Sequence, residues 1–440
     1  MMLKLIAITL LAFAATYVAA LLLIPAARRL GLVDLPDARK THHGEVPTVG
    51  GIAIVLGVIE TGLLMGNLDQ VHPAFWTGLL VIVLIGTLDD LRDLGYRSKF
   101  LAQIAAAALM VFWAGWYLHS LGNLVGHWPL ALGVLAIPFS LFAIIGVINA
   151  VNFSDGADGL AGGLAFNALL WVVVIAAIGA RGAAGDIQIM LAFLGAIAAF
   201  LAFNLRRPPH RKALIFLGDA GSLGLGFVLA WFMVWGAERP DPIFAPVTAI
   251  WLLAVPLADT ITCAGRRLLN GTSPFKADRK HLHHILVDMG LPIERAVAVI
   301  HGCAFILAAA GVAGWYFRVP EHVMFFLAMG IFAAYIVFSA EALRVIDARR
   351  ARVQPLGARA RNEASFLHQA NEPVGVAAET AAGTMGLLQV AVTRGERTGR
   401  GAYKRGSVKR RSLGKVITNP INRAYKIKNA LNSRRRSGRA

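Results

Sequence analysis

The chain has 440 residues, of which 57% are hydrophobic and only 15% are charged. An ordinary water-soluble domain has about half apolar and about a quarter charged residues, so this composition excludes that class. The net charge of +18 lies mainly at one end, because 22 of the 43 Lys and Arg residues but only 6 of the 25 Asp and Glu residues follow Ala340.

Long apolar runs recur along the chain before that basic end. A helix needs about 20 apolar residues to cross about 30 Å of hydrocarbon. Eleven runs approach or reach this length, at residues 4–27, 49–66, 74–88, 100–118, 131–148, 162–180, 188–204, 215–235, 244–262, 296–315 and 321–340. The third run is short, so a tilted or merged helix there would change the count by about one. We predict an all-α polytopic membrane protein with about eleven transmembrane helices.

Basic residues alternate between the loops that join these runs. The loops after odd-numbered runs contain 17 Lys and Arg residues, whereas the opposite loops contain only Arg181, Arg239 and Arg318. Lys and Arg are retained on the cytoplasmic side of a membrane. We therefore expect the N-terminus outside and the C-terminus in the cytoplasm.

The basic end of the chain differs in composition from the rest. It is rich in Arg, Gly, Ser and Ala and has no sustained apolar period, which is typical of disorder. We divide the chain into a transmembrane domain, residues 1–343, and a largely disordered cytoplasmic tail, residues 344–440. Near anionic lipid a basic side chain gains about 1 kcal/mol, so membrane lipid is the expected partner of the tail. Nucleic acid is the less favoured one.

Carboxylates gather in the loops that are expected to be cytoplasmic. Asp89 and Asp90 directly follow the third run, and adjacent like charges repel unless a metal ion, an Arg or a Lys lies between them. Oxygen ligands favour Mg²⁺ or Mn²⁺ over zinc, and Mg²⁺ typically binds together with phosphate. The alternative for this pair alone is that it solvates a helix end.

The sequence NAVNFSDGADGLAGG joins the fifth and sixth runs and contains Asn149, Asn152, Asp155 and Asp158. One polar residue is enough to cap the following helix, so a purely structural role leaves the others unexplained. The glycines let the backbone approach an anion, toward which N–H groups at a helix start can point. This loop is predicted to bind phosphate and metal together.

Two further motifs follow. Asp219 lies in FLGDAGSLGLG at the start of the eighth run, where an N-cap is an equally good interpretation of the residue alone. The stretch ADRKHLHHILVDMG combines basic and imidazole side chains, namely Arg279, Lys280, His281, His283 and His284. It lacks the H-E-x-x-H pattern of zinc proteases. Arg next to His favours a pyrophosphate, with metal ligation and plain interfacial structure as alternatives.

Five motifs in this order resemble those of the polyprenyl-phosphate N-acetylhexosamine-1-phosphate transferases (glycosyltransferase family 4): DLPDARKTHHGEVPTVGG, LDDLRDLGYRSK, NAVNFSDGADGLAGG, FLGDAGS and ADRKHLHH. The similarity covers about residues 1–340. Residues 36–42 and HLHH look like the branch that loads N-acetylglucosamine-1-phosphate onto undecaprenyl phosphate, and less like the branch that transfers phospho-N-acetylmuramoyl-pentapeptide. The basic tail departs from the family pattern.

The resemblance implies a reaction in the bacterial cytoplasmic membrane. With Mg²⁺, UDP-N-acetylglucosamine and undecaprenyl phosphate would give undecaprenyl-diphosphate N-acetylglucosamine and UMP, the first lipid-linked intermediate of a cell-envelope polysaccharide such as lipopolysaccharide O-antigen. Another UDP-N-acetylhexosamine donor and a homodimer stay open. A lipid phosphate is mostly a dianion at neutral pH, since its second pKa is about 6, so we expect direct attack rather than a covalent enzyme intermediate.

The same resemblance implies roles for the motif residues. Asn152 and Asp219 would be metal ligands. Catalytic roles would fall to Asp89 and Asp90, which would handle the lipid phosphate or metal, and to Asp155 and Asp158, which would shape the nucleotide and metal site. Substrate binding would involve Lys99, which would pair with phosphate, as well as Lys40, His42, Asn149, Arg279, His281, His283 and His284.

Two other protein classes share parts of this pattern. CDP-alcohol phosphatidyltransferases need D-G-x-x-A-R, but here Gly162 follows Asp158-Gly-Leu-Ala and the arginine is missing. A transporter would have charges at mid-membrane on broken helices, in two repeated halves. No such repeat is visible in the sequence, and its acidic residues lie at one predicted interface.

Overall fold

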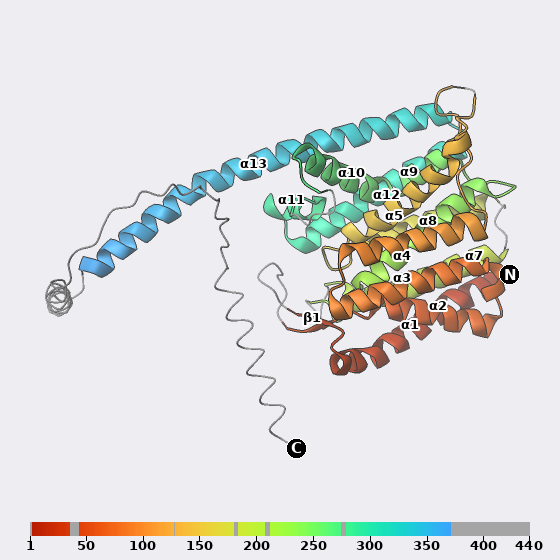
Figure 1. Ribbon diagram of the computed structural model, residues 1–440, viewed down its shortest axis with the longest axis horizontal. Helices are drawn as coiled ribbons and strands as arrows, with labels where there is room; N and C mark the ends of the chain where they lie inside the picture. The colour runs from red at the N-terminus through yellow and green to blue at the C-terminus, as the bar shows by residue number, and fades with distance from the viewer. Residues whose placement is uncertain are drawn as a thin grey trace, which may run out of the picture. The chain divides into compact units, whose positions relative to one another are not determined.

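The computed structural model describes residues 2–35, 44–126, 128–179, 184–206, 212–273 and 279–370, and side-chain surroundings up to residue 351. Nearly all regular structure in these residues is helical (Figure 1). Eight of the described helices are long and apolar enough to cross a membrane. The protein is therefore an all-α polytopic membrane protein.

The long helices are α1 (Met2–Leu30), α3 (Pro73–Arg92), α5 (Ala136–Phe153), α6 (Leu160–Ile178), α7 (Ala184–Asn204), α8 (Gly218–Glu238), α12 (Ile293–Tyr316) and α13 (Glu321–Ala370). The shorter helices are α2 (Gly50–Met65), α4 (Tyr96–Ala108), α9 (Pro246–Leu252), α10 (Ala254–Leu269) and α11 (Leu282–Asp288). Single turns are η1 (Leu68–Gln70), η2 (Leu109–Trp113) and η3 (Gly133–Leu135). Two-residue strands β1 (Val33–Asp34) and β2 (Val46–Pro47) pair antiparallel.

Each of the eleven apolar runs overlaps a helix, but three runs are not single long helices. Helix α2 has 16 residues, and α4 is prolonged by the π-helical turn η2. Helices α9 and α10 meet at 82°. The break at Leu253 follows from Pro256, which has no N–H to donate to the carbonyl of Leu252. Length and composition support eight or nine spans in the described residues, so the number eleven and the orientation stay predictions.

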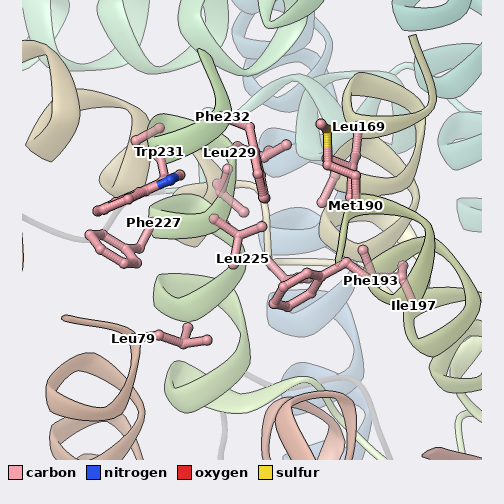
Figure 2. Packing of buried hydrophobic residues seen from close by; sticks show 14 of the residues in the cluster. Leu79, Leu169, Met190, Phe193, Ile197, Leu225, Phe227, Leu229, Trp231 and Phe232 are labelled. Atoms are coloured by element: carbon pink, nitrogen blue, oxygen red, sulfur yellow. The ribbon is translucent and has the colours of Figure 1, made fainter. Parts of the chain in front are cut away.

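Helix α8 lies at the centre of the bundle and packs against α2, α3, α5 and α6. Its most apolar 18-residue window is fully buried. Aromatic side chains dominate this core, where Phe75 of α3 contacts Phe227, Trp231 and Phe232 of α8 as well as Phe193 of α7. Figure 2 shows the three α8 side chains and Phe193 among their apolar neighbours. Lipid tails are as apolar as these side chains, so close packing and polar contacts hold such helices together.

Close packing also sets where α3 ends relative to α8. A Cβ atom on Gly86 would lie only 2.5 Å from the Cα and the N of Ala220. Only glycine lets the two backbones approach this closely. Because Asp89 and Asp90 follow Gly86 within about one turn, this contact places them beside the first turn of α8, which contains Asp219.

The basic tail is described only in part. Helix α13 continues past residue 343, the predicted end of the transmembrane domain, and ends at Ala370. Residues 371–440 lie outside the described residues. The predicted domain division and the predicted disorder of the tail stay predictions.

Candidate active site

Four helix ends bring polar side chains together at one end of α8. Lys99, at the start of α4, places its Nζ 3.0 Å from Asp89 Oδ2 and 2.9 Å from Asp219 Oδ2. Asn152, near the end of α5, donates a hydrogen bond of 2.9 Å to Asp219 Oδ1. We call Asp89, Asp90, Lys99, Asn152 and Asp219 the acidic centre. Its members come from three of the predicted motifs, namely LDDLRDLGYRSK, NAVNFSDGADGLAGG and FLGDAGS.

Asp89 is the least satisfied carboxylate of the acidic centre. Its side chain is buried, and Oδ1 has no hydrogen-bond partner among the residues that the structure describes. A buried carboxylate oxygen without a partner is costly. Asp89 and Asp219 share the ammonium of Lys99, and Asp90 adds a third carboxylate, so the acidic centre has more acidic than basic groups and an oxygen that is available to a cation.

Asp90 has a different neighbour from Asp89, although the two are adjacent in sequence. Its Oδ1 accepts the backbone N–H of Asp219 at 3.1 Å, and its Oδ2 lies 3.5 Å from the N of Ala220. Asp90 thus satisfies N–H groups at the start of α8, where a negative charge is favourable. Gly218, with φ of 74°, leaves room for this carboxylate, because a Cβ there would lie 2.5 Å from Asp90 Oδ2.

Asp219 is not an N-cap, which was the alternative interpretation from sequence. The N-cap position is Leu217, and Asp219 lies inside the first turn of α8. Asn152 Nδ2 also donates to Ser222 Oγ at 2.8 Å. Both N–H groups of the Asn152 amide are therefore used, and its Oδ1 accepts no hydrogen bond from the described residues, so it is available as an oxygen ligand.

Asn149 lies one turn earlier on α5 and faces α4. Its Nδ2 donates to Gln103 Oε1 at 2.6 Å and to the carbonyl of Ile145 at 2.8 Å. These bonds connect α5 to α4 next to the acidic centre. Asn149 is thus engaged in helix–helix contact, and its predicted role in substrate binding stays a prediction.

The loop between α5 and α6 presents Asp155 and Asp158 differently. Asp158 forms an ion pair with Arg206, which lies just after α7. The Asp155 side chain is exposed and makes no hydrogen bond to the described residues. Protein atoms around its carboxyl group desolvate it, and Asp219, Asp90 and Asp158 repel its charge, which together raise the pKa of Asp155 to about 8. The charges of Asp219 and Asp90 thus act on Asp155, and none of the described residues forms an ion pair with it.

The histidine motif forms the start of α11, which packs through Leu286 on Leu160 and Ala296 of α6 and α12. His283 is buried, and its Nε2 has no hydrogen-bond partner among the described residues. That atom lies against the loop of Asp155, since a Cβ on Gly156 would be 2.5 Å from it. Two of the predicted motifs thus meet at His283 and Gly156.

Burial and neighbouring positive charge lower the pKa of His283 and of His284, so that both favour the neutral form. Burial and the neighbouring His284 and His281 lower the pKa of His283 to about 3. Burial and Arg279 also lower the pKa of His284. A neutral imidazole has one donor and one acceptor nitrogen, so His283 can offer its Nε2 to a ligand in either tautomer.

His281 is occupied by other protein groups. Its Nδ1 lies 2.8 Å from Asp259 Oδ2, and Arg267 lies 3.2 Å from its Nε2. An Arg can only donate, so the tautomer that fits both contacts has its proton on Nδ1. Arg279 is exposed, while Lys40 and His42 lie outside the described residues.

Known proteins match the chain across this acidic centre. The model described as "Glycosyl transferase family 4" matches residues 72–237. A relative from Escherichia coli (strain K12), named undecaprenyl-phosphate alpha-N-acetylglucosaminyl 1-phosphate transferase, is 36% identical over 314 residues, which are 70% of this chain and 84% of the relative. Relatives of the same name from Pasteurella multocida (strain Pm70) and Yersinia pestis are each 35% identical, over 71% and 70% of this chain and 87% and 84% of their own lengths.

The chain belongs to glycosyl transferase family 4. The family match contains all five residues of the acidic centre but ends before the histidine motif. The acidic centre thus lies inside the matched segment, whereas α11 and His283 lie outside it and meet the loop of Asp155 in the structure.

Three residues of this family 4 member were not predicted from sequence. Asp259 was hidden in an apolar run, although a carboxylate in such a run is itself a functional signal. Arg206 was counted only as a basic loop residue, and Tyr335 of α13 carries no local signal because its hydroxyl partner, Asp259, lies 76 positions away.

The donor set of the acidic centre fits a magnesium ion. Asp219, Asp89 and the Oδ1 of Asn152 are hard oxygen donors, which Mg²⁺ prefers, and no thiol lies among the five residues of the centre. The unpartnered Oδ1 of Asp89 is the atom that most needs a cation. Mn²⁺ accepts the same ligands.

Proposed function

We propose that this protein transfers N-acetylglucosamine-1-phosphate from UDP-N-acetylglucosamine to undecaprenyl phosphate and releases UMP. The family and the printed names of its relatives support this reaction. The observation that carries the proposal is the acidic centre, which gathers three carboxylates, one ammonium and one amide at the ends of membrane helices. A lipid phosphate at the membrane surface could reach such a site while its chain stays in the bilayer.

Asn152 and Asp219 would hold Mg²⁺, with Asp89 beside them. When bound, the ion would supply positive charge to the pyrophosphate of the donor. Lys99 contacts both Asp89 and Asp219. Neutralising these carboxylates would let the ammonium pair with a phosphate instead, which reconciles the observed contacts with the predicted role of Lys99.

The proposed step is an in-line phosphoryl transfer. An oxygen of the lipid phosphate forms a bond to the sugar-bearing phosphorus, and the bond from that phosphorus to the bridging oxygen breaks, so that UMP leaves with that oxygen. The attacking phosphate is already mostly a dianion at neutral pH, so positioning and charge stabilisation should dominate the rate. Asp90 would hold the first turn of α8, and with it Asp219, in place.

The donor would bind between the acidic centre and α11. His283 offers an unpartnered Nε2 beside Gly156, and the exposed Arg279 lies nearby in sequence. A neutral imidazole and a guanidinium suit the sugar and the pyrophosphate respectively. Lys40 and His42 would complete this region.

Location and partners follow from the charge pattern. We place the acidic centre on the cytoplasmic side of a bacterial inner membrane, because the basic loops lie at the same helix ends and nucleotide sugars are cytoplasmic. The tail would contact anionic lipid. A cell-envelope polysaccharide such as O-antigen would take the product.

The decisive experiment is a UMP-release assay with purified protein, undecaprenyl phosphate, Mg²⁺ and a panel of UDP-sugars. We expect UDP-N-acetylglucosamine to give the highest rate. Faster release from another UDP-N-acetylhexosamine would keep the reaction and change the donor. Absence of UMP with every donor, or substrate movement without UMP, would overturn the proposal in favour of a transporter.

A further inference from the structure

A second polar cluster, outside the acidic centre, lies where α10, the start of α11 and α13 meet. At its centre is Asp259 of α10, which is only 6% exposed. Its Oδ2 lies 2.8 Å from His281 Nδ1, and its Oδ1 accepts the backbone N–H of Leu282 at 2.9 Å and the hydroxyl of Tyr335 at 2.6 Å. One carboxylate thus connects α10, the start of α11 and α13.

This cluster uses every polar atom of His281. The ring donates to Asp259 and accepts from Arg267. It also stacks on His283 at a centroid distance of 6.2 Å and lies tilted against Phe153 at 5.9 Å. A ligand could bind His281 only by breaking one of these contacts. His283, two residues later, has the opposite character, since its Nε2 is buried and unpartnered.

A metal ion is a weaker explanation of the same cluster. Asp259, Cys263 and His281 place possible ligand atoms within 4.8 Å of one another. However, Arg266 donates to Cys263 Sγ at 3.2 Å, and Arg267 lies at the only other nitrogen of His281. Two guanidinium groups would repel a cation at this point.

We propose that Asp259 and Tyr335 are positioning residues, which hold His281 and the first turn of α11 so that His283 presents its Nε2 to the donor beside Gly156. The proposal rests on the proposed function. Helix α11 has only seven residues, too few to be stable alone. Apolar contacts of Leu286 and Ile285 hold its other side, so the bonds of Asp259 are what fixes its rotation at the polar end.

The test is a kinetic comparison of variants with UDP-N-acetylglucosamine and undecaprenyl phosphate varied separately. Asp259→Asn should lower kcat/KM for the donor by about 10- to 100-fold, the usual effect of losing a supporting charged partner. Tyr335→Phe removes one hydrogen bond and should cost about five-fold. The KM for undecaprenyl phosphate should change less than about twofold in both, because Asp259 acts on the donor side.

A double-variant cycle separates positioning from general stability. If Asp259 acts through His281, Asp259→Asn combined with His281→Gln should be no worse than His281→Gln alone, whereas independent effects multiply. Three results would overturn the proposal. They are effects of the two single variants that multiply in the double variant, equal changes in the kinetics of both substrates, and donor kinetics of Tyr335→Phe that equal those of wild type. Tyr335→Phe keeps the test valid if Asp259→Asn fails to fold.

Asp288→Asn is the matched control. It removes the ion pair of 2.8 Å between Asp288 and Arg350, which also joins α11 to α13, but it lies at the far end of α11. Its kinetics should stay within about twofold of wild type, because an exposed pair contributes little. Wild-type protein without UMP release would refute the proposed function, whereas active wild type with a fully active Asp259→Asn would refute only this inference.

Discussion

Two buried aspartates, Asp89 and Asp259, differ in how their oxygens are satisfied. They are 7% and 6% exposed. Asp259 accepts from three protein donors, whereas Asp89 has Lys99 at one oxygen and no partner at the other among the described residues. Burial alone therefore does not mark a ligand site. The satisfied carboxylate holds helices together, and the incomplete one is available to a substrate or a metal.

The same contrast separates His281 from His283. Both belong to HLHH, and both are buried. His281 is used at both ring nitrogens, whereas the Nε2 of His283, which lies beside Gly156, has no partner among the described residues. Within one short motif, the tertiary contacts thus distinguish a structural residue from one that is ready to bind.

The largest effect should come from the acidic centre. Asp219→Asn should lower turnover by more than about a hundredfold, since it removes charge at the proposed metal position, and should weaken Mn²⁺ binding measured by electron paramagnetic resonance. Asp259→Asn should leave Mn²⁺ binding unchanged. Full turnover of Asp219→Asn with labelled UDP-N-acetylglucosamine would contradict the metal assignment. The control variant is Asp69→Asn, which changes an exposed residue of η1.

A slightly smaller effect should follow from separating the helices that form the acidic centre. Gly86→Ala places a methyl group 2.5 Å from the backbone of Ala220, which should cost about 1–3 kcal/mol of stability. Turnover should fall more than about tenfold as Asp89 moves from Asp219. Gly146→Ala, where a Cβ meets nothing within 4 Å, should be nearly neutral. Equal behaviour of the two variants in thermal melts and UMP release would argue against the packing explanation.

Burial of His283 should make the stability of the protein depend on pH. Its pKa is lowered to about 3 in the folded protein, against about 6.5 unfolded, so the unfolded state binds the proton first. The contribution of the neutral His283 to the free energy of unfolding should be fully present above about pH 6.5. It should be lost as the pH falls from there toward 3. His283→Gln should flatten the melting temperature between about pH 6.5 and 5, and His322→Gln should not. Parallel curves for wild type and His283→Gln would contradict this.

The smallest loss of activity should come from breaking the ion pair of Asp158 and Arg206. Arg206 is partly exposed at 28%, so the pair should contribute no more than about 1 kcal/mol. Arg206→Gln should lower UMP release by less than about tenfold, and the difference from wild type should shrink as salt is raised. A loss as large as that of Asp219→Asn would place this pair inside the chemistry.

The packing of helices could be predicted only in outline. Apolar length located all eight long helices but not α11, because a membrane span is a local property of about 20 residues. It did not locate the 82° break between α9 and α10, although Pro256 gave a signal. Nor could apolar length show that Gly86 brings α3 against α8, since that depends on the surface of a helix more than 130 positions away.

The sequence by itself determined the class of the protein and the residues of the acidic centre. Composition, apolar runs and ordered motifs are properties of neighbouring residues, and they require no knowledge of the fold. Only the tertiary structure decided that Asp90 contacts the start of α8 while Asp89 contacts Lys99, and that Asp259 and Tyr335 support His281. The reason is physical: a buried polar atom must find a partner, and its partner is set by helices that meet in space although they lie far apart in the chain.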